Sequence, residues 1–297
     1  MFDLRYHVAS LAAVFLALVI GILVGVGLSS GGFIKKSERA LLNRQIADLQ
    51  SRLDSTSKAL GDLSRERRTT DVFVKQTYPA LMNDRLAGKR VAILFVGSVD
   101  PHVRSLVERT LADAGAGDPL RVRAIKVPVD ASALDRLLDG RPAFARYAGA
   151  EGAADLGRRL AAEFLAGGKA PAWKLLSAQL VEERSGDDKP SADAIVVVRS
   201  ASPQRGPTAR LLAGLYAGLH AGRIPAVGVE TSGEAESAIE AFRKADLASV
   251  DDVDALGGRL ALALLLGGAK PGSYGIKQTA KDGILPPVEP APAPAGS

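Results

Sequence analysis

The chain has no cysteine and is poor in the other residues that bind soft metal ions. Its 297 residues include no Cys, two Met and three His. Disulfide bonds and thiolate metal centres are therefore excluded, whereas the compartment stays open, because exported proteins without disulfides resemble cytosolic ones in this respect. The remaining soft ligands are far apart in the sequence, at Met1, His7, Met82, His102 and His220. We predict no dedicated metal site and no resident cofactor.

Aromatic residues are also scarce, at 5% of the composition, and the formal net charge is only +5. The basic excess lies in residues 35–90, which hold thirteen Lys and Arg against seven Asp and Glu. Basic residues that are interleaved with acidic ones, without aromatic side chains to stack on bases, are a poor footprint for nucleic acid. We expect no nucleic-acid partner, and an anionic membrane surface is the better neighbour for this segment.

One long uncharged run is present, at residues 8–28. Its 21 residues, at about 1.5 Å each in a helix, span about 31 Å, the thickness of the hydrocarbon core of a bilayer. A cleaved signal peptide has a shorter apolar core and a small-residue cleavage site, whereas this run is followed by "SSGGFIKK". We therefore predict a retained transmembrane anchor. Ala17, Gly21 and Gly25 share one face of this helix and would let a second helix approach, although small residues are also common in anchors that do not pair.

Leucine and isoleucine recur after the anchor in alternating steps of four and three, which is the apolar seam of a short coiled coil. We predict that this helix ends before "TTDVFVKQTYPAL" (69–81), where β-branched residues and Pro79 break the pattern. One amphipathic helix folded against the globular part is the alternative. A coiled coil next to an anchor with a small-residue face favours a parallel homodimer held by anchor and stalk. The seam consists of Leu42, Ile46, Leu49, Leu53, Leu60 and Leu63.

From residue 89 onward, short apolar runs alternate with amphipathic segments. This alternation predicts an α/β fold with a Rossmann-like, mainly parallel sheet and helices on both faces. Residues 168–191 are ambiguous and fit a short helix and a loop, and the Pro/Ala-rich end is expected to be disordered. The predicted strands are 90–97, 120–127, 194–200 and 224–230, and the predicted helices are 102–114, 153–166, 208–221, 234–244 and 253–266. The predicted organisation is a membrane anchor (1–33), a coiled-coil stalk (34–70), a linker (71–88), the α/β domain (89–277) and a disordered tail (278–297).

The sequence contains no pattern typical of a nucleotide site or a catalytic centre. The first predicted strand ends in "FVGSVDPHVRSL", which has one Gly where a dinucleotide fingerprint needs three, and no Walker-type lysine follows. No nucleophile and base form a recognisable pair, so we predict no catalytic residues and expect that the protein is not an enzyme.

A ligand-binding rim is the remaining prediction for the sheet. Ligands of open parallel sheets bind beyond the carboxyl ends of the strands. Gly206 and Pro207 precede a predicted helix whose free N–H groups could hold an anion, although a proline in the first helical turn also has a purely structural explanation. The predicted rim consists of Gln204, Gly206, Thr208, Glu230 and Ser232.

Three aspartates, Asp251, Asp252 and Asp254, stand before the apolar run "LALALLLGG" (260–268). That run is too short to cross a bilayer and fits a core helix. Asp at the first positions of a helix accepts free backbone N–H groups, so we assign one or two of these residues, Asp251 first, to helix capping. A hard-cation site formed by Asp251 and Asp254 is the alternative, but the sequence does not identify the further oxygen ligands that it needs.

The order of these parts is more specific than any single motif. The anchor and the leucine stalk are followed by "RSASPQRGPTARLLAGLYAGL", "IPAVGVE" and "SVDDVDALGGRLALALLLGGAKPGSYGIK". In this order the chain resembles the actinobacterial copper transporter family typified by MctB. The resemblance implies a single-pass envelope protein with a coiled-coil stalk, a Rossmann-like domain and a role in copper transport or homeostasis. A related member, SteB, is associated with cell separation and acts with the membrane protein SteA, so a structural or regulatory role without copper is the alternative.

The orientation in the membrane is a point of conflict. Lys35, Lys36, Arg39 and Arg44 follow the anchor, whereas only Arg5 and the amino terminus precede it. The positive-inside rule alone would place the stalk in the cytoplasm, whereas the resemblance implies the outside. We follow the resemblance and expect a cell-membrane protein with an extracytoplasmic C-terminal domain. Any transport role would then require an oligomer or a partner.

Overall fold

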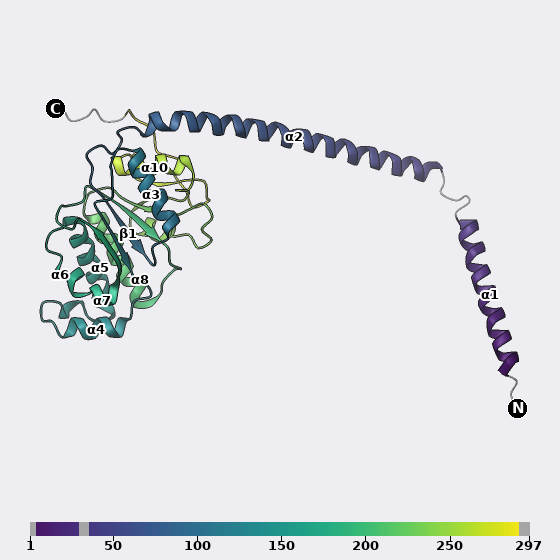
Figure 1. The fold of residues 1–297 in the computed structure, drawn as a ribbon, viewed down its shortest axis with the longest axis horizontal. Helices are drawn as coiled ribbons and strands as arrows, with labels where there is room; N and C mark the ends of the chain where they lie inside the picture. The colour runs from purple at the N-terminus through teal and green to yellow at the C-terminus, as the bar shows by residue number, and fades with distance from the viewer. Residues whose placement is uncertain (1–3, 30–35, 291–297) are drawn as a thin grey trace. The chain divides into compact units, whose positions relative to one another are not determined.

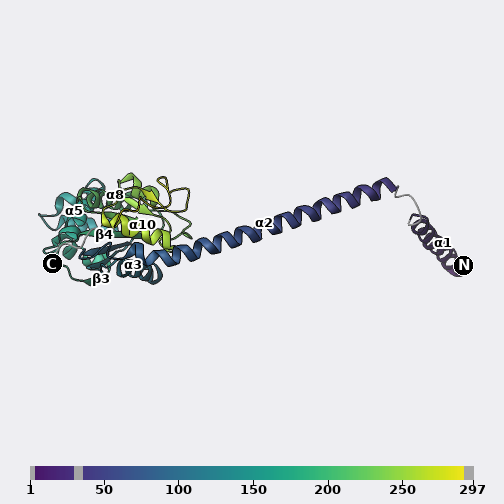
Figure 2. The ribbon, with the colours of Figure 1, turned by 90° about the horizontal axis from the view of Figure 1, so that it is seen from above.

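The computed structural model describes residues 4–29 and 36–290 of the chain (Figure 1). The chain divides into two compact units, and the division falls between Thr70 and Asp71. The first unit is helical, and the second contains a sheet with helices on both sides, as the two perpendicular views show (Figures 1 and 2).

The first unit comprises helix α1 (Leu4–Ser29) and most of helix α2 (Lys36–Met82). Within the residues that the structure describes, no helix combines the length and the apolar character needed to cross a membrane. Ala17, Gly21 and Gly25 lie in α1, and the space next to both glycines is open in the single chain. The predicted anchor and its pairing with a second helix stay predictions.

Helix α2 carries the predicted leucine seam as one continuous helix. The exposed fractions of the six seam side chains run from 51% at Ile46 to 66% at Leu53. The pairing of this seam with a second helix stays a prediction.

Helix α2 does not end where the sequence predicts. It continues through Pro79 to Met82, so most of the predicted linker (71–88) is helical. Tyr78 and Met82 are buried in the core of the second unit, and the Tyr78 hydroxyl donates to the Asp113 carboxylate at 3.1 Å. This tertiary packing outweighs the weak helix propensity of the β-branched residues, on which the prediction rested.

The second unit is built on a seven-stranded sheet with the order β3-β2-β1-β4-β5-β6-β7 in the described part of the chain. Neighbouring strands are parallel except β2 and β3, which are antiparallel. The strand order reverses between β1 and β4, which is the doubly wound, Rossmann-like arrangement that the sequence predicts. The bounds are β1 (Val91–Val96), β2 (Arg121–Ile125), β3 (Val181–Gly186), β4 (Ala194–Arg199), β5 (Ala226–Val229), β6 (Ala248–Val250) and β7 (Ser273–Tyr274).

One face of the sheet is covered by α5 (Gly149–Ala166) and α8 (Gly206–Ala221), with shorter helices around them. The two helices approach closely because both have glycine at the crossing. A Cβ atom on Gly214 would lie 2.0 Å from the carbonyl oxygen of Ala154, so no larger side chain fits there. The shorter elements on this face are α4 (Ala131–Asp139), the 3-10 helix η1 (Ala145–Tyr147), α6 (Pro171–Leu175), α7 (Ser177–Leu180) and α9 (Ile239–Lys244).

The opposite face is covered by α3 (Pro101–Asp113), α10 (Leu256–Gly267) and the end of α2. Apolar residues of these helices form a second core with the strand side chains that point to this face of the sheet. Leu262 of α10 is fully buried in this core. This burial confirms that the run "LALALLLGG" belongs to a core helix. The two cores together account for the continuous apolar runs of β1 and β4, whose residues are all buried.

The structure confirms the four predicted strands and the five predicted helices, with shifted boundaries and with α9 starting later than expected. The sequence did not predict β6 and β7, which are too short for a periodic pattern, or α4. The ambiguous residues 168–191 form α6, α7 and β3. Strand β3 alternates between half-buried and exposed residues because it is the edge of the sheet. Its charged residues interrupt any apolar run, so the sequence does not indicate a strand there.

The tail predicted to be disordered, residues 278–297, is attached to the domain along its first part. The Thr279 hydroxyl donates to the Asp251 carboxylate at 3.1 Å, and the Asp282 carboxylate accepts from the backbone N–H of Ser273 at 2.8 Å. Polar side chains therefore hold a segment whose composition alone indicates disorder. The last seven residues of the predicted tail lie outside the described residues.

Candidate functional site

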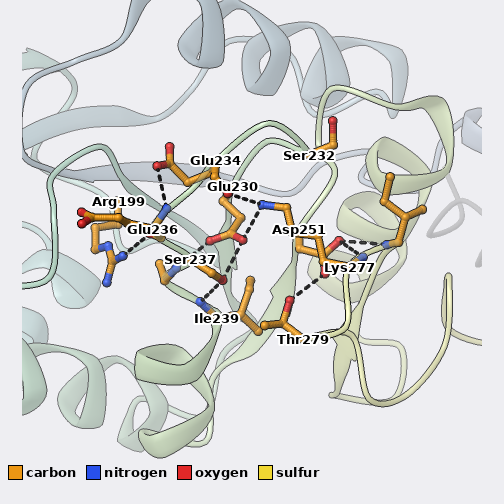
Figure 3. Close-up of polar contacts among 12 residues, drawn as sticks. Arg199, Glu230, Ser232, Glu234, Glu236, Ser237, Ile239, Asp251, Lys277 and Thr279 are labelled. Carbon is orange, nitrogen blue, oxygen red and sulfur yellow. Dashed lines mark hydrogen bonds and ion pairs between the residues drawn. The ribbon is translucent and has the colours of Figure 1, made fainter.

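A cluster of charged side chains lies at the carboxyl ends of β5, β6 and β7 (Figure 3). Glu230 follows β5, and Asp251 follows β6 directly. Parallel strands bring these ends to one edge of the sheet, where ligands of doubly wound folds bind. The segment after β7 adds Lys277 to the same edge. We call Glu230, Asp251, Asp252, Asp254 and Lys277 the carboxylate cluster.

The loops after β1 and β4, between which doubly wound folds usually bind nucleotides, contact each other directly. The Ser200 hydroxyl donates to the backbone carbonyl of Ser98, which joins the two loops. A Cβ atom on Gly97 would lie 2.9 Å from the Cβ of Ala201. The first residues of the two loops therefore leave no space between them for a side chain at Gly97.

Glu230 binds two other segments of its own chain. Its side chain is only 1% exposed, and its Oε1 accepts from Lys277 Nζ at 2.9 Å and from the Ser237 hydroxyl at 2.8 Å. Its Oε2 accepts from the backbone N–H of Ala238 at 2.6 Å. A buried carboxylate requires such partners, because burying an unpaired charge is costly. Glu230 thus joins β5, the start of α9 and the segment after β7.

Asp251 does not cap helix α10, contrary to the prediction. The N-cap position is occupied by Ala255, which makes no side-chain capping hydrogen bond. The fully buried Asp251 carboxylate accepts instead from the backbone N–H groups of Ile276 at 2.9 Å and Lys277 at 3.3 Å, and from the Thr279 hydroxyl. These N–H groups lie beyond the end of β7 and need an acceptor, a requirement that no sequence pattern reveals.

Gly275 allows the segment after β7 to lie directly against the aspartates. Its φ is +138°, and a Cβ atom there would lie 2.0 Å from Oδ1 of Asp251 and 3.0 Å from Oδ1 of Asp252. Gly258 likewise allows helix α10 to lie directly against Asp252, because a Cβ atom at Gly258 would lie 2.5 Å from Oδ1 of Asp252. Only glycine fits both positions.

Asp252 is buried, and its Oδ1 has no hydrogen-bond partner among the described residues. Burial, and after it the negative charges of Asp251 and Asp254, raise the pKa of the Asp252 carboxyl from 3.8 to about 7. The positive charge of Lys277 acts in the opposite direction. Asp252 therefore gains or loses its proton near neutral pH, inside a cluster whose other carboxylates are paired.

Asp254 and Ser232 bind each other. The two Asp254 oxygens accept from the Ser232 backbone N–H and from its hydroxyl, both at 2.6 Å. Burial alone raises the pKa of Asp254, but the hydrogen bonds from Ser232 outweigh it and hold that pKa below its ordinary value. Asp254 therefore keeps its negative charge next to Asp252 at neutral pH.

The residues of the predicted rim do not share one set of hydrogen bonds. Glu230 and Ser232 belong to, or bind, the carboxylate cluster. Thr208 lies in α8, where its hydroxyl accepts at 3.1 Å from a backbone N–H before α4, and Gly206 opens α8 with a φ of +58°. The Gln204 side chain donates to a backbone carbonyl of its own loop at 2.8 Å. Ligand binding by these residues stays a prediction.

Lys277, which belongs to the carboxylate cluster, and Thr279, which binds Asp251 of that cluster, were not predicted from the sequence. Their only signal is a lysine and a threonine shortly after Gly275, and such a pattern is too common to indicate a site. Arg199 was missed as well, and at the end of β4 its guanidinium donates to the backbone carbonyl of Glu236 at 2.6 Å.

The carboxylate cluster fastens segments of the chain together. The acceptors of Glu230, Asp251 and Asp254 are already used by amides, hydroxyls and the Lys277 ammonium. Across residues 4–29 and 36–290, no group of three or more His, Cys, Asp or Glu side chains is arranged to hold a metal ion. The carboxylate cluster therefore holds the segment after β7 on the sheet. It also places one titratable carboxyl, Asp252, beneath that segment.

These features define an α/β protein of Rossmann-like fold in which the segment after β7 binds the ends of β5 and β6. The family described as "Copper transport outer membrane protein, MctB" matches residues 1–285, and the chain belongs to this family. The match covers both compact units and nearly all of the described residues.

Two curated relatives illustrate the similarity. The chain is 28% identical over 137 residues to proteins named "Copper transporter MctB" from Mycobacterium bovis and from Mycobacterium tuberculosis. The aligned region is 46% of this chain and 42% of each relative, so the similarity spans less than half of those proteins.

Proposed function

We propose that the protein is a single-pass, membrane-anchored envelope protein that takes part in copper transport or homeostasis by assembling with other chains. Membership of the MctB family and the name of the mycobacterial relatives support the copper-related role. The scarcity of soft ligands argues that the chain does not itself hold the ion, because copper prefers Cys, Met and His. We propose no catalytic residue.

The anchor in this proposal is the apolar part of α1. This part of the proposal rests on the sequence, because residues 8–28 carry no charged side chain and their number matches the roughly 20 residues that a bilayer core requires. Orientation with the α/β domain outside the cytoplasm follows from the family resemblance.

The observation that carries the proposal is the exposed apolar seam of α2. Six Leu and Ile side chains at coiled-coil spacing are more than half exposed in the single chain. Burying a leucine contributes roughly 1.5–3 kcal/mol, so pairing this seam with a second α2 would supply a large driving force. We propose a parallel homodimer in which α1 contributes through Ala17, Gly21 and Gly25.

The experiment that tests the copper role is complementation in the native host. Deleting the gene is expected to raise or lower cellular copper, and the wild-type gene is expected to restore it. A variant with Leu49→Asp and Leu53→Asp should fail to restore copper although it accumulates to the same level. A matched variant with Ser51→Asp and Ser55→Asp adds the same charge outside the seam and should complement fully. Unchanged copper in the deletion strain would contradict the proposed role.

Direct copper binding is tested separately. Equilibrium dialysis of the full chain in detergent micelles against Cu(I) and Cu(II), with a moderate chelator present, is expected to leave less than one ion per chain. Stoichiometric retention of copper would contradict the part of the proposal that assigns the ion to an assembly. The orientation is tested by topology reporters fused after Leu63 and after Ser297.

A structural or regulatory role in the envelope is the second candidate, and the internally paired carboxylate cluster favours it. A domain whose strand ends are occupied by its own side chains is suited to presenting a surface. Under this second candidate function, the protein acts as SteB-like proteins do, with a SteA-like membrane protein as partner. A deletion strain with a defect in cell separation and normal copper content would favour this candidate over the first.

A further inference from the structure

A second polar site lies at the antiparallel edge of the sheet and shares no residue with the carboxylate cluster. It is a cavity of ≈ 520 Å³ beside β2, β3 and α6. Its volume falls within the range of about 300–1,000 Å³ that is typical of small-molecule sites. The charged side chains that line it are Arg123, Lys169, Lys174, Arg184 and Asp188.

Arg123 is the best fixed of these groups. Its side chain is only 3% exposed, and its guanidinium carbon lies 5.1 Å from the centre of the Trp173 ring. One of its terminal nitrogens donates to Asp188 at 2.5 Å, whereas its buried Nε has no hydrogen-bond partner among the described residues. A guanidinium that is removed from water in this way requires negative charge nearby.

The cavity contains more positive than negative charge. Asp188 is shared, because it also accepts from Arg184 Nε at 2.8 Å. Lys169 and Lys174 form no ion pair with any residue that the structure describes. Four cationic side chains thus face one carboxylate. This excess of positive charge is suited to binding an anion that carries more than one negative charge.

The wall of the cavity is rigid. The Trp173 indole N–H donates to the backbone carbonyl of Leu160 at 2.8 Å. The buried Glu163 carboxylate accepts from the backbone N–H groups of Ala172 at 2.9 Å and Trp173 at 3.3 Å, so the first turn of α6 is satisfied within the protein. Binding in the cavity would therefore rely on the basic side chains, which are already held in place on one side.

We propose that this cavity binds a small molecule that carries at least two negative charges in phosphate or carboxylate groups. Arg123 and Arg184 present fixed donors suited to such oxygens, and Lys169 and Lys174 supply mobile positive charge at the entrance. The site does not depend on the proposed copper role or on dimerisation.

The test uses Trp173, which is the one tryptophan of the chain. Its fluorescence reports only on this cavity, so the full chain in detergent micelles is titrated with pyrophosphate and, separately, with citrate at constant ionic strength. We expect a saturable change in emission and a higher melting temperature with at least one of the two. The stronger of the two responses identifies phosphate or carboxylate as the bound chemistry.

Two double variants make the test specific. Lys169→Gln with Lys174→Gln should raise the anion concentration at half-saturation by about tenfold. The reason is that two charge-assisted contacts are lost, from exposed side chains that the fold does not need. Lys58→Gln with Lys75→Gln removes the same charge from exposed positions of α2 and should bind like the wild type. An absence of saturation with either anion, or equal weakening in both double variants, would overturn the proposal.

Discussion

Lys277 Nζ lies 2.9 Å from Oε1 of Glu230, and the two side chains are 18% and 1% exposed. This ion pair fastens the segment after β7 to the end of β5. Replacing Lys277 with Gln would leave the Glu230 charge buried without its cationic partner. We expect the free energy of unfolding to fall by about 3 kcal/mol, as measured by chemical denaturation.

The control for this change is Lys281→Gln, which removes the same charge from an exposed position four residues further on. It should alter the free energy of unfolding by less than about 0.5 kcal/mol. If the two variants were equally stable, the ion pair would contribute nothing beyond a solvated surface charge, and the carboxylate cluster would not hold the C-terminal segment.

Replacing Asp251 with Ala should destabilise the protein more than the loss of a helix cap would. The change leaves the backbone N–H groups of Ile276 and Lys277 and the Thr279 hydroxyl without their acceptor. We expect a loss of about 3 kcal/mol, because buried donors without partners are costly. Hydrogen exchange should show the Ile276 and Lys277 amides losing protection first, whereas loss of protection at the first turn of α10 would restore the capping interpretation.

The raised pKa of Asp252 predicts that the free energy of unfolding falls as the pH rises. Its pKa is about 7 in the folded protein and near 3.8 in the unfolded chain, so between these values the folded state binds the proton more tightly. Stability from this group is therefore fully present below about pH 3.8, is lost progressively as the pH rises from there, and is gone above about pH 7. The Asp252→Asn variant should be nearly as stable as the wild type at low pH, should gain relative to it between these two values, and should keep a constant advantage above about pH 7.

The matched control is Asp254→Asn. The Asp254 pKa is held below its ordinary value by Ser232, so this carboxylate is ionised throughout the neutral range. Removing its charge also lowers the pKa of Asp252, so the melting temperature of Asp254→Asn relative to the wild type should change with pH, but less than that of Asp252→Asn. A constant difference between Asp252→Asn and the wild type from pH 5 to pH 8 would show that Asp252 does not titrate in this window.

The fold follows from the sequence wherever burial is continuous. Strands such as β1 and β4 are buried at every residue, so they appear in the sequence as uninterrupted apolar runs. Elements that are short or partly exposed left no such pattern, as β3 and β7 show. Helix α2 extends past its expected end because Met82 packs into the core, which is a tertiary effect that local propensity cannot reveal.

The candidate site was less predictable for a related reason. Asp251 and its partner Ile276 are far apart in the sequence, and the contact depends on Gly275 bringing the chain back over the end of β6. Helix capping is the local use of such an aspartate and was therefore the natural prediction. Glu230 was correctly placed at the end of its strand, but its partner Lys277 comes from a segment next to the predicted tail.

The last prediction concerns the seam of α2, which we expect to pair in membranes. A cysteine introduced at Leu60 has no competing thiol in a chain without Cys, so its crosslinking reports on the seam alone. Rapid and nearly complete crosslinking is expected in an otherwise wild-type chain. The anchor would already hold two chains side by side, and this tethering raises the effective concentration for a seam of modest length.

Adding Leu49→Asp and Leu53→Asp to the Leu60→Cys chain places like charges opposite one another in the seam. We expect crosslinking to slow by at least about 100-fold, because each buried leucine that is lost weakens pairing by roughly 1.5–3 kcal/mol. Ser51→Asp with Ser55→Asp lies outside the seam and should leave the crosslinking rate unchanged, and neither pair should shift the melting temperature of the α/β domain. If cysteines at Leu60 and at Leu49 both failed to crosslink in the wild-type seam, α2 would have to pair with a different protein.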